Sequence, residues 1–180
     1  MQRTRVAVVG LGNVGRGAAE AVAASPDFEL AGIVRRRAEP GARAAGPNWE
    51  APVVTRIDEL GEVRAALMCR PTRELEPMEH SLLRSGISVV DTFDIHGEPL
   101  WNRRQLLATS AVEGQSTAVI AAGWDPGADS VIRALLEIIA PTGITYTNFG
   151  PGTSMGHSVA VRAMPGVADA VSITIPAGYG

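Results

Sequence analysis

A glycine pattern near the start of the chain constrains its fold more than any other feature. The apolar residues 6–9 lead into Gly10, Gly12 and Gly15, spaced as Gly-x-Gly-x-x-Gly, and residues 14–24 then have the pattern of a helix. The first glycine allows a tight turn, the second lets a pyrophosphate approach the backbone, and the third lets the helix pack close to the strand. Phosphates favour a helix N-terminus because its unpaired N–H groups and its dipole attract negative charge. The pattern therefore predicts a dinucleotide-binding turn.

The end of the next expected strand indicates which dinucleotide is bound. Residues 30–34 are apolar, and Arg35, Arg36 and Arg37 follow them. An NAD site would place Asp or Glu here to bind the ribose hydroxyls, whereas guanidinium groups suit the additional phosphate of NADP. The alternative interpretation is a solvated basic turn. The sequence favours NADP.

Composition and charge narrow the class of protein. With 180 residues, 46% of them hydrophobic, the chain can form one full domain with a sizeable core and part of another. It contains no apolar run as long as a membrane span and no export signal. The net charge of −3 argues against a general nucleic-acid binder, and the single cysteine, Cys69, excludes an internal disulfide. We therefore expect a cytoplasmic protein.

Strand-like and helix-like segments alternate in the first part of the chain. The expected strands are 6–9, 29–34, 53–55, 65–69, 88–90 and 118–121, and the expected helices or helical turns are 14–24, 57–60, 74–85 and 100–113. Residues 38–52, rich in Ala, Gly and Pro, are expected to form a loop with at most a broken helical turn. Such alternation predicts an α/β fold with a doubly wound parallel sheet.

The character of the sequence changes towards its end. We expect a helix at 128–139, strands at 144–149 and 170–175, and a glycine-rich loop at 150–156. This loop lacks the Lys-Ser/Thr ending of a P-loop, so we interpret it as a flexible loop over a substrate.

Polar residues gather where the expected strands end, and ligands of parallel sheets bind beyond these ends. Two carboxylates stand out there, Asp94 and Asp125. Such a pair near a nicotinamide could hold a substrate ammonium group and accept a proton as an amine is oxidised to an imine. The alternative for Asp125 is a helix N-cap with Pro126 at the first helical position. Both roles can coexist.

Several further residues allow more than one interpretation. For Asp91, hydrogen bonding to a loop or a ribose competes equally with a chemical role. His96 and His157 are loop histidines, which are more often solvated or structural than catalytic. Phe149 and Met155 could form an apolar wall of a substrate site or pack in a core. We expect no metal site.

Four blocks of the sequence resemble the NADP-dependent meso-diaminopimelate dehydrogenase family. They are Gly-Leu-Gly-Asn-Val-Gly-Arg at 10–16, Val-Asp-Thr-Phe-Asp-Ile-His at 90–96, Ala-Gly-Trp-Asp-Pro-Gly at 122–127 and Asn-Phe-Gly-Pro-Gly-Thr-Ser-Met-Gly-His-Ser at 148–158. The first block is common to dinucleotide enzymes, and the last two are much more specific. The resemblance implies a Rossmann NADP-binding domain at 1–123 and, at 124–180, the N-terminal part of an α+β substrate-binding and dimerisation domain.

The resemblance also implies a reaction, the reversible oxidative deamination of the D-configured centre of meso-diaminopimelate. Hydride passes from that carbon to NADP, and water hydrolyses the imine to L-2-amino-6-oxoheptanedioate and ammonia. The nicotinamide supplies the hydride chemistry, and the protein supplies geometry and charge. The resemblance places this activity in lysine biosynthesis, in a homodimer whose partner is a small-molecule substrate, with no nucleic acid or membrane involved.

The family's functional positions map onto residues of this chain. Asp94 and Asp125 would be the catalytic candidates that bind the reacting amino group, with Trp124 beside them. The other substrate-binding residues would be Phe149, Met155, Gly156 and Thr174. The cofactor would contact Gly10, Leu11, Gly12, Asn13, Val14, Gly15, Arg35, Arg36, Arg37, Cys69, Arg70, Pro71, Thr72, Asp91, Thr92, Ala121, Ala122 and Gly123.

The chain departs from the family at its end. Family members continue well beyond Gly180, and their later residues include an arginine, a histidine and an asparagine that bind the distal end of the substrate. We therefore expect either part of a longer protein or a naturally shortened form. Two alternative functions stay open: a related NADP-dependent amino-acid dehydrogenase or imine reductase, and a non-catalytic NADP-binding fragment.

Overall fold

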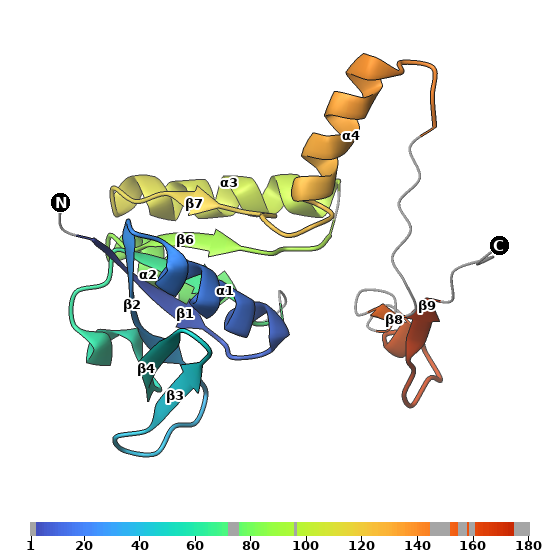
Figure 1. Ribbon diagram of the computed structural model, residues 1–180. Helices are drawn as coiled ribbons and strands as arrows, with labels where there is room; N and C mark the ends of the chain where they lie inside the picture. The colour runs from blue at the N-terminus through green and yellow to red at the C-terminus, as the bar shows by residue number, and fades with distance from the viewer. Residues whose placement is uncertain are drawn as a thin grey trace. The chain divides into compact units, whose positions relative to one another are not determined.

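The computed structural model describes residues 3–71, 76–95, 97–144, 152–154, 158 and 161–174 (Figure 1). The chain divides into two compact units, Met1–Ser130 and Val131–Gly180, which are described separately below. Among the described residues, no helix combines the length and the apolar character that crossing a membrane requires.

A seven-stranded sheet forms the centre of the first unit, counted over the described residues, with the order β3-β4-β2-β1-β5-β6-β7. Its strands are β1 (Thr4–Val9), β2 (Phe28–Val34), β3 (Arg43–Gly46), β4 (Trp49–Val54), β5 (Ala65–Met68), β6 (Ser88–Asp91) and β7 (Ala118–Val119). The β3–β4 pair is antiparallel, and the other neighbouring pairs are parallel. The strand order reverses at β1, between β2 and β5, so the doubly wound parallel sheet is confirmed.

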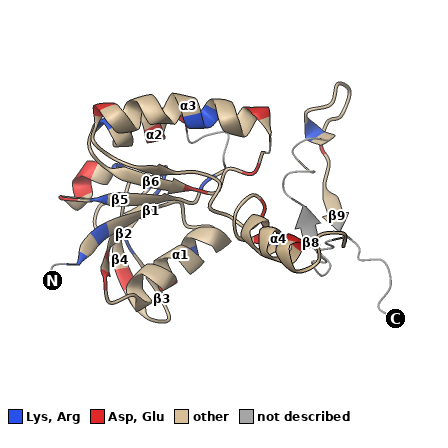
Figure 2. Ribbon diagram, turned by 90° about the horizontal axis from the view of Figure 1, so that it is seen from above, with Lys and Arg blue, Asp and Glu red and all other residues tan. Residues whose placement is uncertain are grey.

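Helices cover both faces of this sheet (Figure 2). Helix α1 (Asn13–Ala24) lies on one face, and α2 (Glu76–Arg84) and α3 (Glu98–Glu113) lie on the other. Successive β1 side chains serve opposite faces because strand side chains alternate: Val8 packs in the core cluster that contains Ala19 of α1, and Val9 packs in the cluster beneath α2 and α3.

The approach of α1 to the sheet depends on Gly15. This residue is buried, and a Cβ at its position would collide with the carbonyl oxygen of Gly10. Gly17, on the same helix, is exposed and has open space around the position of its Cβ.

The expectation of a loop at 38–52 is wrong for its second half. Residues 43–54 form the β3–β4 hairpin, with Gly46 opposite Trp49. The alternating pattern of β4 buries Trp49, Ala51 and Val53 beside α1, and the Ala, Gly and Pro content of the segment hid this pattern. The adjacent helical turn is present as the 3-10 helix η1 (Ile57–Leu60).

The other expected elements of this unit are present with shifted ends. The largest change is at β7, which has two residues instead of the expected 118–121. Ala121 takes a left-handed conformation with φ of 57°, and its N–H donates to the Asp91 side chain. A residue in this conformation does not continue a strand.

The second unit contains most of helix α4 (Ala128–Ile139), which has the expected bounds. Strands β8 (Gly152–Ser154) and β9 (Ser172–Thr174) form an antiparallel pair, and the buried Ser158 hydroxyl accepts a 2.9 Å hydrogen bond from the Ser172 N–H. The expected loop at 150–156 is therefore a strand over its described residues. The expected strand at 144–149 lies outside the described residues except for Ile144, which is in no strand.

A buried ionic cluster joins α2, β6 and α3. The guanidinium group of Arg103 donates to Oδ2 of Asp91, from Nη2 at 2.9 Å and Nε at 3.2 Å, and to Oε2 of Glu79. Both carboxylates are fully buried. Burial raises the pKa of Glu79 to about 7, and the nearby Asp91 carboxylate adds to this effect while Arg103 opposes it. Glu79 Oε1 is buried without a hydrogen-bond partner among the described residues.

We expect Gly15→Ala to lower the free energy of unfolding by about 2–3 kcal/mol, because the new methyl group must displace backbone atoms. Gly17→Ala is the matched control on the same helix and should raise the free energy of unfolding by about 0.5–1 kcal/mol. Urea unfolding of the 180-residue chain, followed by circular dichroism, measures both values. Equal stability of the two variants would contradict the packing role of Gly15.

We expect the stability of the wild type, relative to Glu79→Gln, to fall as the pH rises from about 4.5 to about 7. In this range Glu79 is protonated in the folded state and has already lost its proton in the unfolded state. The free energy of unfolding therefore falls as the pH rises towards the raised pKa. Urea unfolding of both proteins at several pH values gives the difference in free energy of unfolding. A difference that does not change with pH would refute the raised pKa.

Candidate active site

The glycine-rich turn leaves the N-terminus of α1 open. Gly10 has φ of 98°, and a Cβ there would lie 2.6 Å from the carbonyl oxygen of Cys69, so the position requires glycine. Gly12 is the N-cap residue, is exposed, and has no heavy atom within 4 Å of its Cβ position. The first turn of the helix carries no acidic residue. This geometry suits a phosphate group at the backbone N–H groups.

The parallel sheet brings the predicted cofactor residues to one edge. Hydrogen bonds join successive strand ends: the Gly10 N–H donates to Val34 O, and the Cys69 N–H donates to Val9 O. The Ala122 N–H donates in the same way to Asp91 O, at 2.8 Å. The predicted residues at this edge, among those described, are Gly10, Leu11, Gly12, Asn13, Val14, Gly15, Arg35, Arg36, Arg37, Cys69, Arg70, Pro71, Asp91, Thr92, Ala121, Ala122 and Gly123. Thr72 lies outside the described residues.

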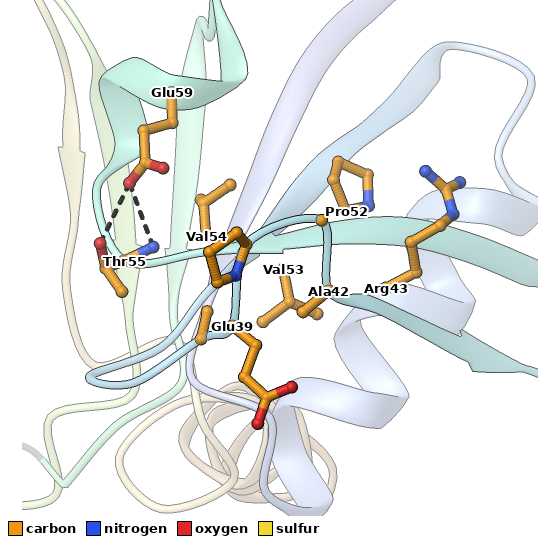
Figure 3. A pocket seen from close by; sticks show the side chains of 11 residues that line it. Glu39, Ala42, Arg43, Pro52, Val53, Val54, Thr55 and Glu59 are labelled. Atoms are coloured by element: carbon orange, nitrogen blue, oxygen red, sulfur yellow. Dashed lines mark hydrogen bonds between the residues drawn. The ribbon is translucent and has the colours of Figure 1, made fainter.

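The three arginines follow β2 and are exposed. The loop after them, residues 38–43, forms one wall of a cavity of about 400 Å³, and residues 52–55 of the hairpin side form the other (Figure 3). Glu59 also lines it, and its Oε1 accepts hydrogen bonds from the N–H and the hydroxyl of Thr55. Sequence reasoning missed this cavity because it expected a loop at 38–52 and did not pair that segment with the strand expected at 53–55.

Cys69 has no sign of nucleophilic activation. It follows β5, and burial raises the pKa of its thiol to about 11. A thiol with this pKa is protonated near neutral pH, and only the thiolate is a strong nucleophile. Its position beside Gly10 therefore indicates packing at the turn.

Asp91 is committed to hydrogen bonds within the protein. Its side chain is fully buried; Oδ1 accepts hydrogen bonds from the N–H groups of Phe93 at 3.0 Å and Ala121 at 2.8 Å, and Oδ2 accepts from Arg103. Of the two hydrogen-bonding roles considered for Asp91, the geometry supports binding to the loops. A ribose contact by this buried carboxylate is not supported.

Asp94 and Asp125 lie on neighbouring loops and are both exposed. Asp94 follows β6 and Asp125 follows β7, and these strands are parallel neighbours, so both loops leave the same end of the sheet. Trp124, next to Asp125, is 45% exposed. Two exposed carboxylates at this edge can attract a cationic amine.

The alternative interpretation of Asp125, a helix N-cap with Pro126 at the first helical position, does not match the start of the helix. Helix α4 begins at Ala128, two residues after Pro126, and the Asp125–Pro126 bond is cis. The Ala128 N–H donates to Gly123 O at 3.0 Å, and the Asp129 N–H donates to Trp124 O at 2.7 Å. Asp125 therefore belongs to the tight turn before the helix.

The structure does not show whether the remaining predicted residues lie near the edge of the sheet that carries Asp94 and Asp125. Phe149, Met155, Gly156, His96 and His157 lie outside the described residues. Thr174 ends β9 in the second unit, where it is paired with Gly152. Within the described part of the chain, no group of three or more His, Cys, Asp or Glu residues could hold a metal ion.

Sequence reasoning also missed Arg103 and Glu79. The buried residues of α3 are Arg103, Leu107 and Ser110, spaced as one face of a helix, but it is the structure that identifies this face as the buried one. A cation on that face needs a buried partner.

Comparison with known proteins agrees with this architecture. Residues 4–91 match the oxidoreductase family with an NAD-binding Rossmann fold, and residues 123–179 match the diaminopimelic acid dehydrogenase C-terminal domain. The meso-diaminopimelate D-dehydrogenase of Bacteroides fragilis is 50% identical over 180 residues, which are 100% of this chain and 59% of that protein.

Two solved structures are similar in fold and sequence. C. glutamicum DAP dehydrogenase in complex with DAP has a TM-score of 0.71 and 31% identity, over 95% of this chain and 52% of that one. An engineered D-amino acid dehydrogenase bound to NADP+ has a TM-score of 0.70 and 30% identity, over 94% of this chain and 52% of that one.

The chain thus spans a little over half the length of these relatives. The resemblance predicted from four sequence blocks is confirmed, as is the fold class. Over its whole length the chain is similar in sequence to meso-diaminopimelate D-dehydrogenases, with a match to a Rossmann-fold oxidoreductase family in its first part and to the diaminopimelic acid dehydrogenase C-terminal domain in its last.

Proposed function

We propose that this chain belongs to an NADP-dependent oxidoreductase that reversibly deaminates the D-centre of meso-2,6-diaminopimelate, giving L-2-amino-6-oxoheptanedioate and ammonia. The observation that carries the proposal is the position of two exposed carboxylates, Asp94 and Asp125, on neighbouring loops at the edge where the glycine-rich turn opens. The 50% identity to the B. fragilis enzyme supports the choice of substrate.

In this proposal the open N-terminus of α1 binds the cofactor pyrophosphate, and Gly12 lets it approach the backbone. Arg35, Arg36 and Arg37 bind the additional phosphate of NADP, for which their exposed guanidinium groups are suited. When bound, the nicotinamide accepts the hydride. The relative bound to NADP+ supports this choice of cofactor.

Asp94 and Asp125 hold the ammonium group of the D-centre and accept its proton, since the amine must be neutral before its carbon can release hydride. Loss of hydride from the carbon and of a second proton from the nitrogen gives an imine, and water then replaces the nitrogen. Trp124 supplies an exposed indole beside Asp125. Met155, Gly156, Phe149 and Thr174 complete the proposed substrate site.

We also propose a boundary between a cofactor domain at 1–123 and a substrate domain at 124–180, supported by the family match that begins at residue 123. A homodimer, a cytoplasmic location and a role in lysine biosynthesis complete the proposal, which treats the substrate as a small molecule and involves no nucleic acid or membrane.

We expect NADPH formation at alkaline pH with meso-diaminopimelate and none with the L,L isomer. The assay uses the 180-residue chain and a chimera in which these residues are followed by the remainder of the B. fragilis relative. Asp125→Asn in the chimera should lower kcat/KM by about 100-fold or more, because it removes a proton acceptor, with NADPH affinity unchanged.

The matched control is Asp27→Asn, an exposed aspartate just before β2 and so at the opposite end of the sheet. It should leave all of these values unchanged. A chimera that binds NADPH but oxidises neither isomer would overturn the proposed substrate.

We expect replacement of Arg35, Arg36 and Arg37 by Ser to weaken NADPH binding by about 100-fold while NADH binding changes little, because only NADPH carries the additional phosphate. Arg64→Ser is the control, since this exposed arginine precedes β5 at the other end of the sheet. Fluorescence titration of each variant with both cofactors measures the effect. Equal losses for NADPH and NADH would show that the arginines do not select NADP.

A further inference from the structure

One carboxylate oxygen connects the two loops that carry Asp94 and Asp125. Oδ1 of Asp91 accepts the N–H of Phe93 at 3.0 Å and the N–H of Ala121 at 2.8 Å. Phe93 directly precedes Asp94, and Ala121 lies four residues before Asp125. The two loops are far apart in sequence and meet at this oxygen.

The second oxygen of the same carboxylate is held by Arg103. Nε and Nη2 of Arg103 both donate to Oδ2, at 3.2 and 2.9 Å. The guanidinium group also lies over the Phe93 ring, 4.7 Å from its centre. Arg103 is 5% exposed and Asp91 is fully buried. Contacts on both oxygens therefore restrict rotation of the Asp91 side chain, and Arg103 contacts the residue before Asp94 directly.

The contacts also impose an unusual backbone conformation. Ala121 has φ of 57°, which residues with a Cβ rarely adopt, and its N–H in this conformation points to Asp91. The next N–H, of Ala122, donates to the Asp91 carbonyl oxygen at 2.8 Å. Two successive N–H groups of the β7 loop are thus bound to one residue of β6.

A buried ion pair is a weak source of stability, because desolvation of the charges offsets much of their attraction. An apolar pair of similar volume would hold α3 on the sheet about as well. It would not supply an acceptor for the two loop N–H groups. What the charged pair adds is a defined position for both loops.

Resting on the proposed function, we propose that Asp91 and Arg103 are positioning residues that set the distance between Asp94 and Asp125 by holding both loops on one carboxylate. Both are buried, so in this proposal they act through the two loops and not by contact with the substrate. Their effect is on the geometry in which the two exposed aspartates meet the amine, and small displacements of such groups have large effects on rate.

The test variant is Arg103→Lys, which keeps the charge but loses the two-nitrogen contact with Asp91. Its matched control is Arg104→Lys, the same substitution one residue along α3 at an exposed arginine. Each variant is made in the chimera described above. Amide hydrogen exchange at Phe93, Ala121 and Val8 is compared with NADPH affinity and with kcat and KM for meso-diaminopimelate.

Arg103→Lys is expected to speed exchange at Phe93 and Ala121 by about 10-fold or more and to leave Val8, in the centre of the sheet, unchanged. It should lower kcat/KM by 10- to 100-fold, mainly through kcat, with NADPH affinity within about threefold of wild type. Arg104→Lys should match the wild type in every measurement. Faster exchange at all three amides would indicate a structural role only and overturn the proposal. An unchanged kcat/KM in Arg103→Lys, despite faster exchange at Phe93 and Ala121, would also overturn it.

The wild type provides a test that does not depend on a folded variant. The Phe93 and Ala121 amides lie outside the strands and should nevertheless exchange slowly, because both are bound to a buried carboxylate. Rapid exchange at either amide overturns the proposal. A wild type with slow exchange and no oxidation of meso-diaminopimelate would overturn the proposed function while leaving the loop contacts established.

Discussion

The contact between the first turn of α1 and the end of β1 exists only because Gly10 and Gly15 have no Cβ. A side chain at either position would meet backbone atoms, those of Cys69 in one case and of Gly10 in the other. The close contact aims the helix N-terminus, with its unpaired N–H groups, over the carboxyl edge of the sheet. The proposed cofactor site depends on this arrangement, because the parallel strands end together at that edge.

Charge at this edge is divided between two environments. Asp94 and Asp125 are exposed and can meet a cationic amine, whereas Asp91 is buried with Arg103 and Glu79. The buried cluster has two carboxylates and one guanidinium group, so one negative charge would lack a partner if both carboxylates were ionised. The raised pKa of Glu79 limits this excess, because a proton on Glu79 below about pH 7 removes one of the two negative charges. The Asp91 carboxylate accepts the hydrogen bonds from both loops.

Prediction from the sequence succeeded where the structure of a segment is determined by residues close to one another in the sequence. The bounds of α4 follow from its apolar periodicity, and the roles of Gly10 and Gly15 follow from their spacing. It failed for the β3–β4 hairpin, where Trp49 supplies burial against α1, a helix distant in sequence. At Asp125, Asp-Pro before a helical run left a helix cap open as an alternative, and the structure does not support it. Two more residues of the turn lie between Asp125 and Ala128, where the helix begins, and local propensity does not specify that geometry.

The sequence by itself determined the α/β alternation, the dinucleotide turn and the gathering of polar residues at strand ends, because each depends on neighbours within a few residues. Only the tertiary structure decided what Asp91 does. Its hydrogen-bond partners come from the loop after β7, from α3 and from its own loop, and no periodicity within one segment relates these elements. The fold decides whether a carboxylate is exposed and can bind a substrate, or is buried and holds loops together, by the groups that it packs around it. Burial of a carboxylate without hydrogen-bond partners has a large cost in free energy.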